Sequence, residues 1–271
     1  MSDKKIITLL TDFGLKDVYV GVMKGIIAQI NPHLKVIDLT HQIPPQNLFA
    51  ARFCLLNAYP YFPSETVHLA VVDPGVGSRR KAIAIQLPNG FLVGPDNGIF
   101  SGILENFEIQ NIQVVTLTNS EYWHTDKPSV TFHGRDIFAP VAAHISSGVR
   151  LENLGEKINP ESLVKLPLNN INFTDSGLAG WIQHIDHFGN IITNISRSYI
   201  IEKNWFLVVN NNADFSPGKI ISSGYTYADC KLGELIAIIG SHGFVEIAAN
   251  GGSAGEQLNL KYGDKVEVRW F

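Results

Sequence analysis

The sequence contains few cysteines, little charge and no long hydrophobic run, and each absence narrows the choice of function. Cys54 and Cys230 are its only cysteines, and neither lies in a C-x-x-C or Cys/His ligand spacing, so the sequence predicts neither a disulfide framework nor a zinc site. Charged residues make up 17% of the 271 residues and the formal net charge is -4, which argues against a nucleic-acid binder. No signal-peptide pattern is visible, and no apolar run reaches the ~18 residues of a membrane span. We therefore expect a cytoplasmic protein without membrane or nucleic-acid partners.

What is abundant is hydrophobic sequence, which makes up 45% of the chain, enough for one large core or two modest ones. Through the first 145 residues or so, β-rich runs at 6–10, 36–40 and 66–72 alternate with helical patterns at 20–30 and 48–59. The runs at 81–87 and 91–94 flank a Pro-Asn-Gly turn and predict a hairpin. This alternation favours an α/β domain with a mainly parallel sheet and helices on both faces.

The character of the sequence changes after about residue 150. Residues 151–175 are polar and rich in Asn and Pro, which is typical of a linker or a long surface connection. The remainder consists of short runs of β-forming residues separated by Gly, Asn and Asp, which predicts a smaller all-β barrel or sandwich. We place the α/β domain, with the linker, at residues 1–170 and the β domain at 171–271.

One turn concentrates unusual residues, namely V-V-D-P-G-V-G-S-R-R at positions 71–80. Proline after Asp73 favours an extended backbone, and the two glycines permit a turn that few other residues could follow. Asp-Pro-Gly alone is ordinary turn chemistry. A following arginine can, however, fold back and hold the ionised carboxylate in one orientation. The loop lacks the G-x-x-x-x-G-K-[ST] pattern of a phosphate-binding loop.

Two further clusters lie in the first domain. His133, in T-F-H-G-R-D-I-F-A-P, precedes a predicted helix; it is either a packed core histidine or, beside Gly134, a group facing a ligand. Asp12, in T-D-F-G, follows the first strand, where a carboxylate suits the two hydroxyls of a ribose. Asp17 stands at the mouth of the next helix, where it also suits a simple N-cap.

Two clusters lie in the β-rich part. I-D-H-F-G-N places Asp186 and Asn190 in a tight turn that combines a carboxylate, an aromatic ring and a carboxamide able to read a purine edge. The second cluster is N-G-G-S-A-G-E, at 250–256. On the simplest interpretation it is a flexible loop; alternatively, its small residues let backbone groups approach the flat ring of a ligand closely.

Together these motifs, with V-G-P-D-N-G at 93–98, resemble the S-adenosylmethionine (SAM) hydrolase family, also called the SAM hydroxide adenosyltransferases, in one collinear order. The resemblance implies an N-terminal α/β domain, a C-terminal β-barrel and a homotrimer with active sites between subunits. It implies a water-activating set at Asp73, Arg80 and His133. Substrate contacts are implied at Asp12 for ribose, Asp17 and Asp186 for the methionine end, and Asn190, Ser253 and Ala254 for adenine.

The implied reaction is attack of water or hydroxide on the ribose C5′ of SAM, giving adenosine and methionine without metal or cofactor. Halogenating relatives have tyrosine at the positions of Asp73 and His133, and the fluorinating type has serine at Gly134. A carboxylate at Asp73 would repel a halide. A non-catalytic SAM or adenosine sensor stays open as an alternative, whereas a nucleosidase is disfavoured because no run of aspartates forms a calcium site.

Overall fold

The computed structural model describes residues 5–209 and 218–270, which form two compact units divided between Leu166 and Pro167. None of the helices in this described part combines the length and the apolar character needed to cross a membrane. Cys54 and Cys230 are both free thiols.

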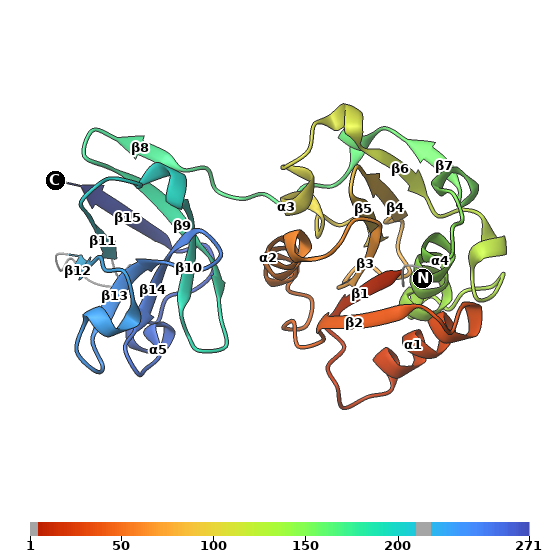
Figure 1. Cartoon of the computed structure of the whole chain (residues 1–271), viewed down its shortest axis with the longest axis horizontal. Coiled ribbons are helices and arrows are strands. Elements are labelled where there is room, and N and C mark those ends of the chain that lie inside the picture. Colours follow the sequence, from red (N-terminus) through yellow and green to blue (C-terminus); the bar gives the residue numbers. More distant parts are fainter. Residues whose placement is uncertain (1–4, 210–217, 271) are drawn as a thin grey trace. The chain divides into compact units, whose positions relative to one another are not determined.

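The first unit is a seven-stranded sheet with helices on both faces (Figure 1). Its strands are β1 (Ile6–Thr11), β2 (Lys35–Thr40), β3 (Thr66–Val71), β4 (Ala82–Leu87), β5 (Gly90–Pro95), β6 (Gln113–Thr116) and β7 (Glu156–Ile158). Its helices are α1 (Tyr19–Ile30), α2 (Leu48–Ala58), α3 (Ser101–Leu104) and α4 (Ala139–Ser146), with a π-helical turn at Gly134–Phe138. The predicted helices, strands and hairpin of residues 6–94 are therefore confirmed.

The strand order is β2-β1-β3-β5-β4-β6-β7. β1, β2, β3 and β5 pair in parallel, whereas β4, β6 and β7 join antiparallel, so the sheet is mixed and not mainly parallel as expected. The reason is the tight β4–β5 hairpin, which reverses the chain without a crossover helix. β7 also lies within the segment that we interpreted as a linker; it is a short polar edge strand, whose three residues give little periodicity to detect.

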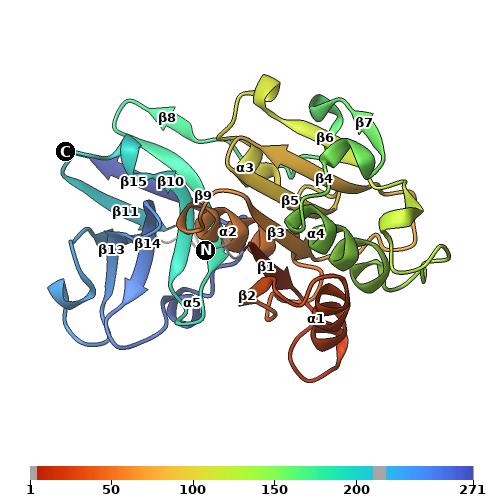
Figure 2. The ribbon, with the colours of Figure 1, turned by 45° about the vertical axis from the view of Figure 1, so that its right-hand side comes forward.

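Two apolar layers cover the sheet. One layer packs α1 and α4 against alternate residues of β1 and β3, and the other packs α2 against the opposite face. Figure 2 shows α1 and α4 on one side of these strands and α2 on the other. The register pairs Thr11 with Val71, so Asp12 and Asp73 leave the carboxyl edge of neighbouring parallel strands.

The second unit is an eight-stranded antiparallel sheet that curls into a nearly closed barrel. Its main path runs β12-β11-β15-β9-β10-β14-β13, with β8 paired to β9. An isolated bridge from Ser223 to Ala237 brings the two ends of this path together. The elements are β8 (Asn172–Thr174), β9 (Gly177–Ile185), β10 (Ile191–Ser196), β11 (Trp205–Val209), β12 (Lys219–Ser222), β13 (Leu235–Ile239), β14 (Phe244–Ala249), α5 (Ala254–Leu258) and β15 (Lys265–Trp270).

Candidate active site

Asp73, Arg80 and His133 form one hydrogen-bonded set at the carboxyl edge of the N-terminal sheet. The Nε of Arg80 donates to both carboxylate oxygens of Asp73, at 2.9 and 3.0 Å, and its Nη2 also pairs with Oδ2. The same Nη2 lies 2.8 Å from Nδ1 of His133. The Arg80 and Asp73 side chains are 9% and 6% exposed, so the ion pair is largely shielded from water.

The contact with Arg80 fixes the tautomer of His133. A guanidinium N–H can only donate, so Nδ1 must accept and the proton of the neutral ring lies on Nε2. Burial and the Arg80 cation lower the pKa of His133, against the opposing charges of Asp73 and Asp136. The imidazole is therefore neutral near pH 7 and offers Nε2–H as a donor.

Local backbone features bring these three side chains together. Gly77 has φ +76°, and a Cβ there would lie 2.5 Å from the carbonyl oxygen of Val130. This approach packs the 73–80 loop against the segment that leads into His133. The π-helical turn places the Phe138 ring beside the Arg80 guanidinium, whose Cζ lies 5.2 Å from the centroid of the ring.

The Arg135–Asp136 pair has a structural role. Asp136 is fully buried, and its carboxylate accepts from Ser129 N and from two nitrogens of Arg135. Burial opposes ionisation of Asp136, but the bonds from Arg135 and Ser129 hold its pKa below the ordinary value. This network anchors the loop that precedes His133.

The T-D-F-G turn approaches the same place. The ring of Phe13 packs edge-on against Phe132 at 5.9 Å, and a Cβ at Gly134 would lie 3.5 Å from Phe13 and 3.1 Å from the sulfur of Met23. Asp12 Oδ2 accepts a hydrogen bond from the backbone N–H of Gln46 at 2.8 Å. The turn that carries Asp12 therefore contacts the segment around His133.

Asp17 is exposed and does not cap the following helix, contrary to one of the two interpretations we gave it. The N-cap of α1 is Val18, which makes no side-chain cap bond. Its predicted contact with the methionine end of a substrate stays a prediction.

The C-terminal candidates also gather. Asp186 Oδ1 accepts the backbone amides of Phe188 and Asn190, and Oδ2 accepts the Asn190 side-chain amide at 3.0 Å. A Cβ at Gly189 would lie 2.1 Å from Oγ of Ser253, so the two motifs touch. Ser253 caps α5, whose first residue, Ala254, is fully buried.

Sequence reasoning missed an ionisable network beside Asp186. Glu246, 3% exposed, accepts the Tyr227 hydroxyl at 3.0 Å and lies 3.0 Å from Nε2 of His242. Burial, with the charges of Glu246 and Asp186, raises the pKa of Tyr227 to about 12. Tyr227 and Asp186 are distant in sequence from the His242–Glu246 pair and share no motif with it, so only the barrel brings them together.

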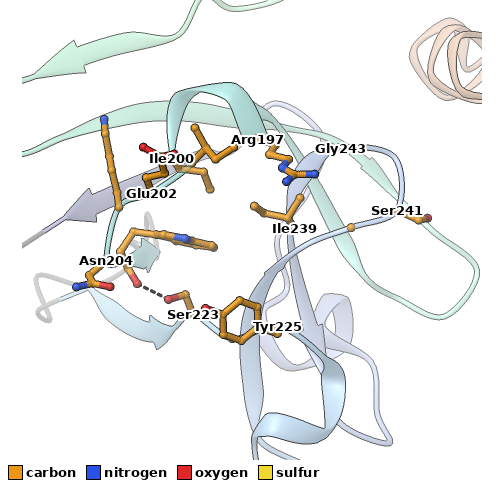
Figure 3. A pocket seen from close by; sticks show the side chains of 14 residues that line it. Arg197, Ile200, Glu202, Asn204, Ser223, Tyr225, Ile239, Ser241 and Gly243 are labelled. Atoms are coloured by element: carbon orange, nitrogen blue, oxygen red, sulfur yellow. Dashed lines mark hydrogen bonds between the residues drawn. The ribbon is translucent and has the colours of Figure 1, made fainter.

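The C-terminal unit also contains a pocket of about 790 Å³ beside β11 and β13 (Figure 3). Arg197, Ile200, Tyr225 and Ile239 line it, and Ser223 donates to the carbonyl oxygen of Trp205 at its edge. None of the predicted site residues lines this pocket. In the described part of the chain, no three His, Cys, Asp or Glu side chains gather so as to hold a metal ion.

Comparison with known proteins decides the family. The SAM hydroxide adenosyltransferase N-terminal domain matches residues 7–155, and the C-terminal domain of the same family matches residues 180–267. The chain belongs to the SAM hydroxide adenosyltransferase family. The resemblance carried by the six motifs is thereby confirmed.

Named relatives cover nearly the whole chain. The (R)-S-adenosyl-L-methionine hydrolases of Salinispora tropica and Methanocaldococcus jannaschii are each 38% identical, over 97% of this chain and 97% and 95% of theirs. A fluorinase of Nocardia brasiliensis is 24% identical over 98% of this chain and 97% of its own. The crystal structure of an uncharacterized conserved protein from Thermotoga maritima superposes with a TM-score of 0.87 at 36% identity, covering 97% of this chain and 99% of the other.

Proposed function

We propose that this family member hydrolyses SAM to adenosine and L-methionine. The full-length relatives named as SAM hydrolases support this assignment. The structural observation that carries it is the bridging of Asp73 and His133 by Arg80, because a binding protein has no use for a shielded carboxylate and imidazole held side by side.

In the proposed reaction, a water oxygen attacks the ribose C5′ as the C5′–S bond breaks. The sulfonium leaves as the neutral thioether of methionine, so no general acid has to protonate it. The Asp73 carboxylate, held in place by Arg80, accepts the water proton and later releases it to solvent. His133 donates Nε2–H to the attacking oxygen and aligns it opposite the sulfur. Of the two groups that the sequence left open as the base, this proposal takes Asp73.

The charge of Asp73 also bears on the choice of substrate. A carboxylate beside the nucleophile disfavours a halide at that position, and its negative charge favours cationic SAM over neutral S-adenosylhomocysteine. Because water is the nucleophile and the leaving group is neutral, the proposed reaction requires neither metal nor cofactor.

The remaining candidates are proposed as substrate contacts. Asp12 suits the ribose hydroxyls, and Asp17 and Asp186 suit the charged methionine end. Asn190, Ser253 and Ala254 are proposed for adenine; the contact of Gly189 with Ser253 supports placing them together.

We further propose that the protein is a cytoplasmic homotrimer whose active sites form between subunits. Exposed apolar side chains in the segments that carry the site support such an interface, because Leu15, Val18 and Val130 are 65%, 73% and 69% exposed in the single chain. A partner subunit would cover such side chains.

Incubation of the purified protein with SAM in ¹⁸O-water tests the function. The proposal requires methionine and adenosine labelled at the 5′-hydroxyl. Binding without turnover would instead indicate a sensor, free adenine a nucleosidase, and a 5′-halogenated nucleoside in chloride or fluoride buffer a halogenase.

A further inference from the structure

The V-G-P-D-N-G motif brackets the loop that carries Asp73 and Arg80. The loop is flanked by two backbone carbonyls, those of Val72 and Lys81. The side-chain amide of Asn97 donates to the Val72 carbonyl at 2.8 Å, and the backbone amide of the preceding residue, Asp96, donates to the Lys81 carbonyl at 2.9 Å. Two adjacent residues after β5 therefore hold both ends of the loop.

The segment that contains Asp96 and Asn97 is itself held in place by its neighbours. Asp96 is 7% exposed, and its carboxylate accepts the Val164 amide at 2.9 Å. Gly98 has φ +93°, and a Cβ there would lie 2.7 Å from Cγ of Leu166. Because its surroundings are close-packed, Asn97 offers its amide from a fixed point.

The bond to Val72 acts directly on the orientation of Asp73. The Val72 carbonyl belongs to the peptide that joins it to Asp73, so holding this oxygen fixes the plane from which the Asp73 side chain leaves. Pro74 follows and restricts Asp73 from the other side. A single amide thereby controls the direction in which the carboxylate meets Arg80.

We propose that Asn97 is a positioning residue, whose hydrogen bond to the Val72 carbonyl aligns Asp73 with Arg80 and, through Arg80, with His133. The inference rests on the proposed function, because it takes these three side chains as the reacting set.

Asn97→Ala tests the proposal, with Asn97→Asp as a near-isosteric second variant that keeps an acceptor for the Ile99 amide but lacks the donor. We expect kcat with SAM to fall about 10- to 100-fold in both, with KM changed less than about threefold. The matched control is Asn106→Ala, because the side-chain amide of Asn106 donates to the carbonyl of Gly102 at 3.0 Å, away from the loop. This control is expected to lose similar thermal stability but no kcat.

A second measurement does not depend on turnover. The charged groups that shift the pKa of His133 are Arg80, Asp73 and Asp136. The Arg80 cation helps to hold this pKa below 6.5. If Asn97 positions the three side chains, its loss should weaken the contact between Arg80 and His133. The pKa of His133, measured by NMR titration, should then rise in the Asn97 variants. It should stay unchanged in the Asn106 control.

The proposal requires both effects. A kcat within twofold of the control, or an unchanged His133 titration, would overturn it. Failure of the proposed function has a different signature, because wild-type protein would then form no labelled adenosine while the His133 titration would still respond to Asn97.

Discussion

At the scale of single residues, Asp73 is the proposed base, and its replacement is expected to separate chemistry from binding. Asp73→Asn keeps the shape but loses the proton acceptor, so we expect kcat to fall about 10²- to 10⁴-fold. Affinity for adenosine, measured by calorimetry, is expected to stay within about twofold because the product is neutral at this position. Asp12→Ala provides the contrast, since losing the proposed ribose contact should mainly raise KM. Wild-type turnover in Asp73→Asn would rule out the proposed base.

The protonation state of His133 predicts how activity depends on pH. Burial and Arg80 lower its pKa from 6.5, so the ring is neutral at pH 7 and gains a proton only as the pH falls further. An imidazolium Nδ1 cannot accept from Arg80, and two cations would then meet. We therefore expect kcat to fall on the acid side with a midpoint below 6.5. A kinetic profile from about pH 5 to 8, compared with the NMR titration of His133, checks this; a midpoint above 6.5 would contradict the lowered pKa of His133.

At the scale of elements, the site depends on how closely the 73–80 loop approaches the segment before His133. Gly77→Ala adds a Cβ 2.5 Å from the Val130 carbonyl oxygen and should separate the two segments. We expect a loss of kcat of about 10-fold or more, because small displacements of reacting groups are costly. Gly263→Ala is the control, since Gly263 has a similar φ of +83° but open space around it.

Both glycine variants should lose about 1 kcal/mol of stability through backbone strain, measured by chemical denaturation. Only Gly77→Ala should lose turnover. Equal kinetics in the two variants would show that the close approach of the loop does not matter for catalysis.

The elements also show what the sequence could and could not predict. Asp12 and Asp73 were placed at strand ends because hydrophobic runs end at polar turns, and parallel pairing then brings neighbouring ends to one edge. The contacts of Asn97 with Val72 and of Glu246 with Tyr227 were not predicted, because they join residues 25 and 19 positions apart through pairing that local patterns do not encode. The mixed sheet was missed for a related reason: the β4–β5 hairpin was predicted, but the antiparallel pairing of β4 with β6 and of β6 with β7 joins strands that are distant in sequence.

At the scale of the whole molecule, the proposed active site between subunits makes a quantitative prediction. Asp73→Asn disables the N-terminal unit and Asn190→Ala is expected to disable the C-terminal unit, so each pure variant should be nearly inactive. If each active site combines units from two different subunits of a trimer, random mixing during co-expression gives about one site in four with both units intact. Turnover should then recover to about a quarter of the wild-type value per site. Variants purified separately and mixed without subunit exchange are the control, and no recovery after co-expression would place each site within a single chain.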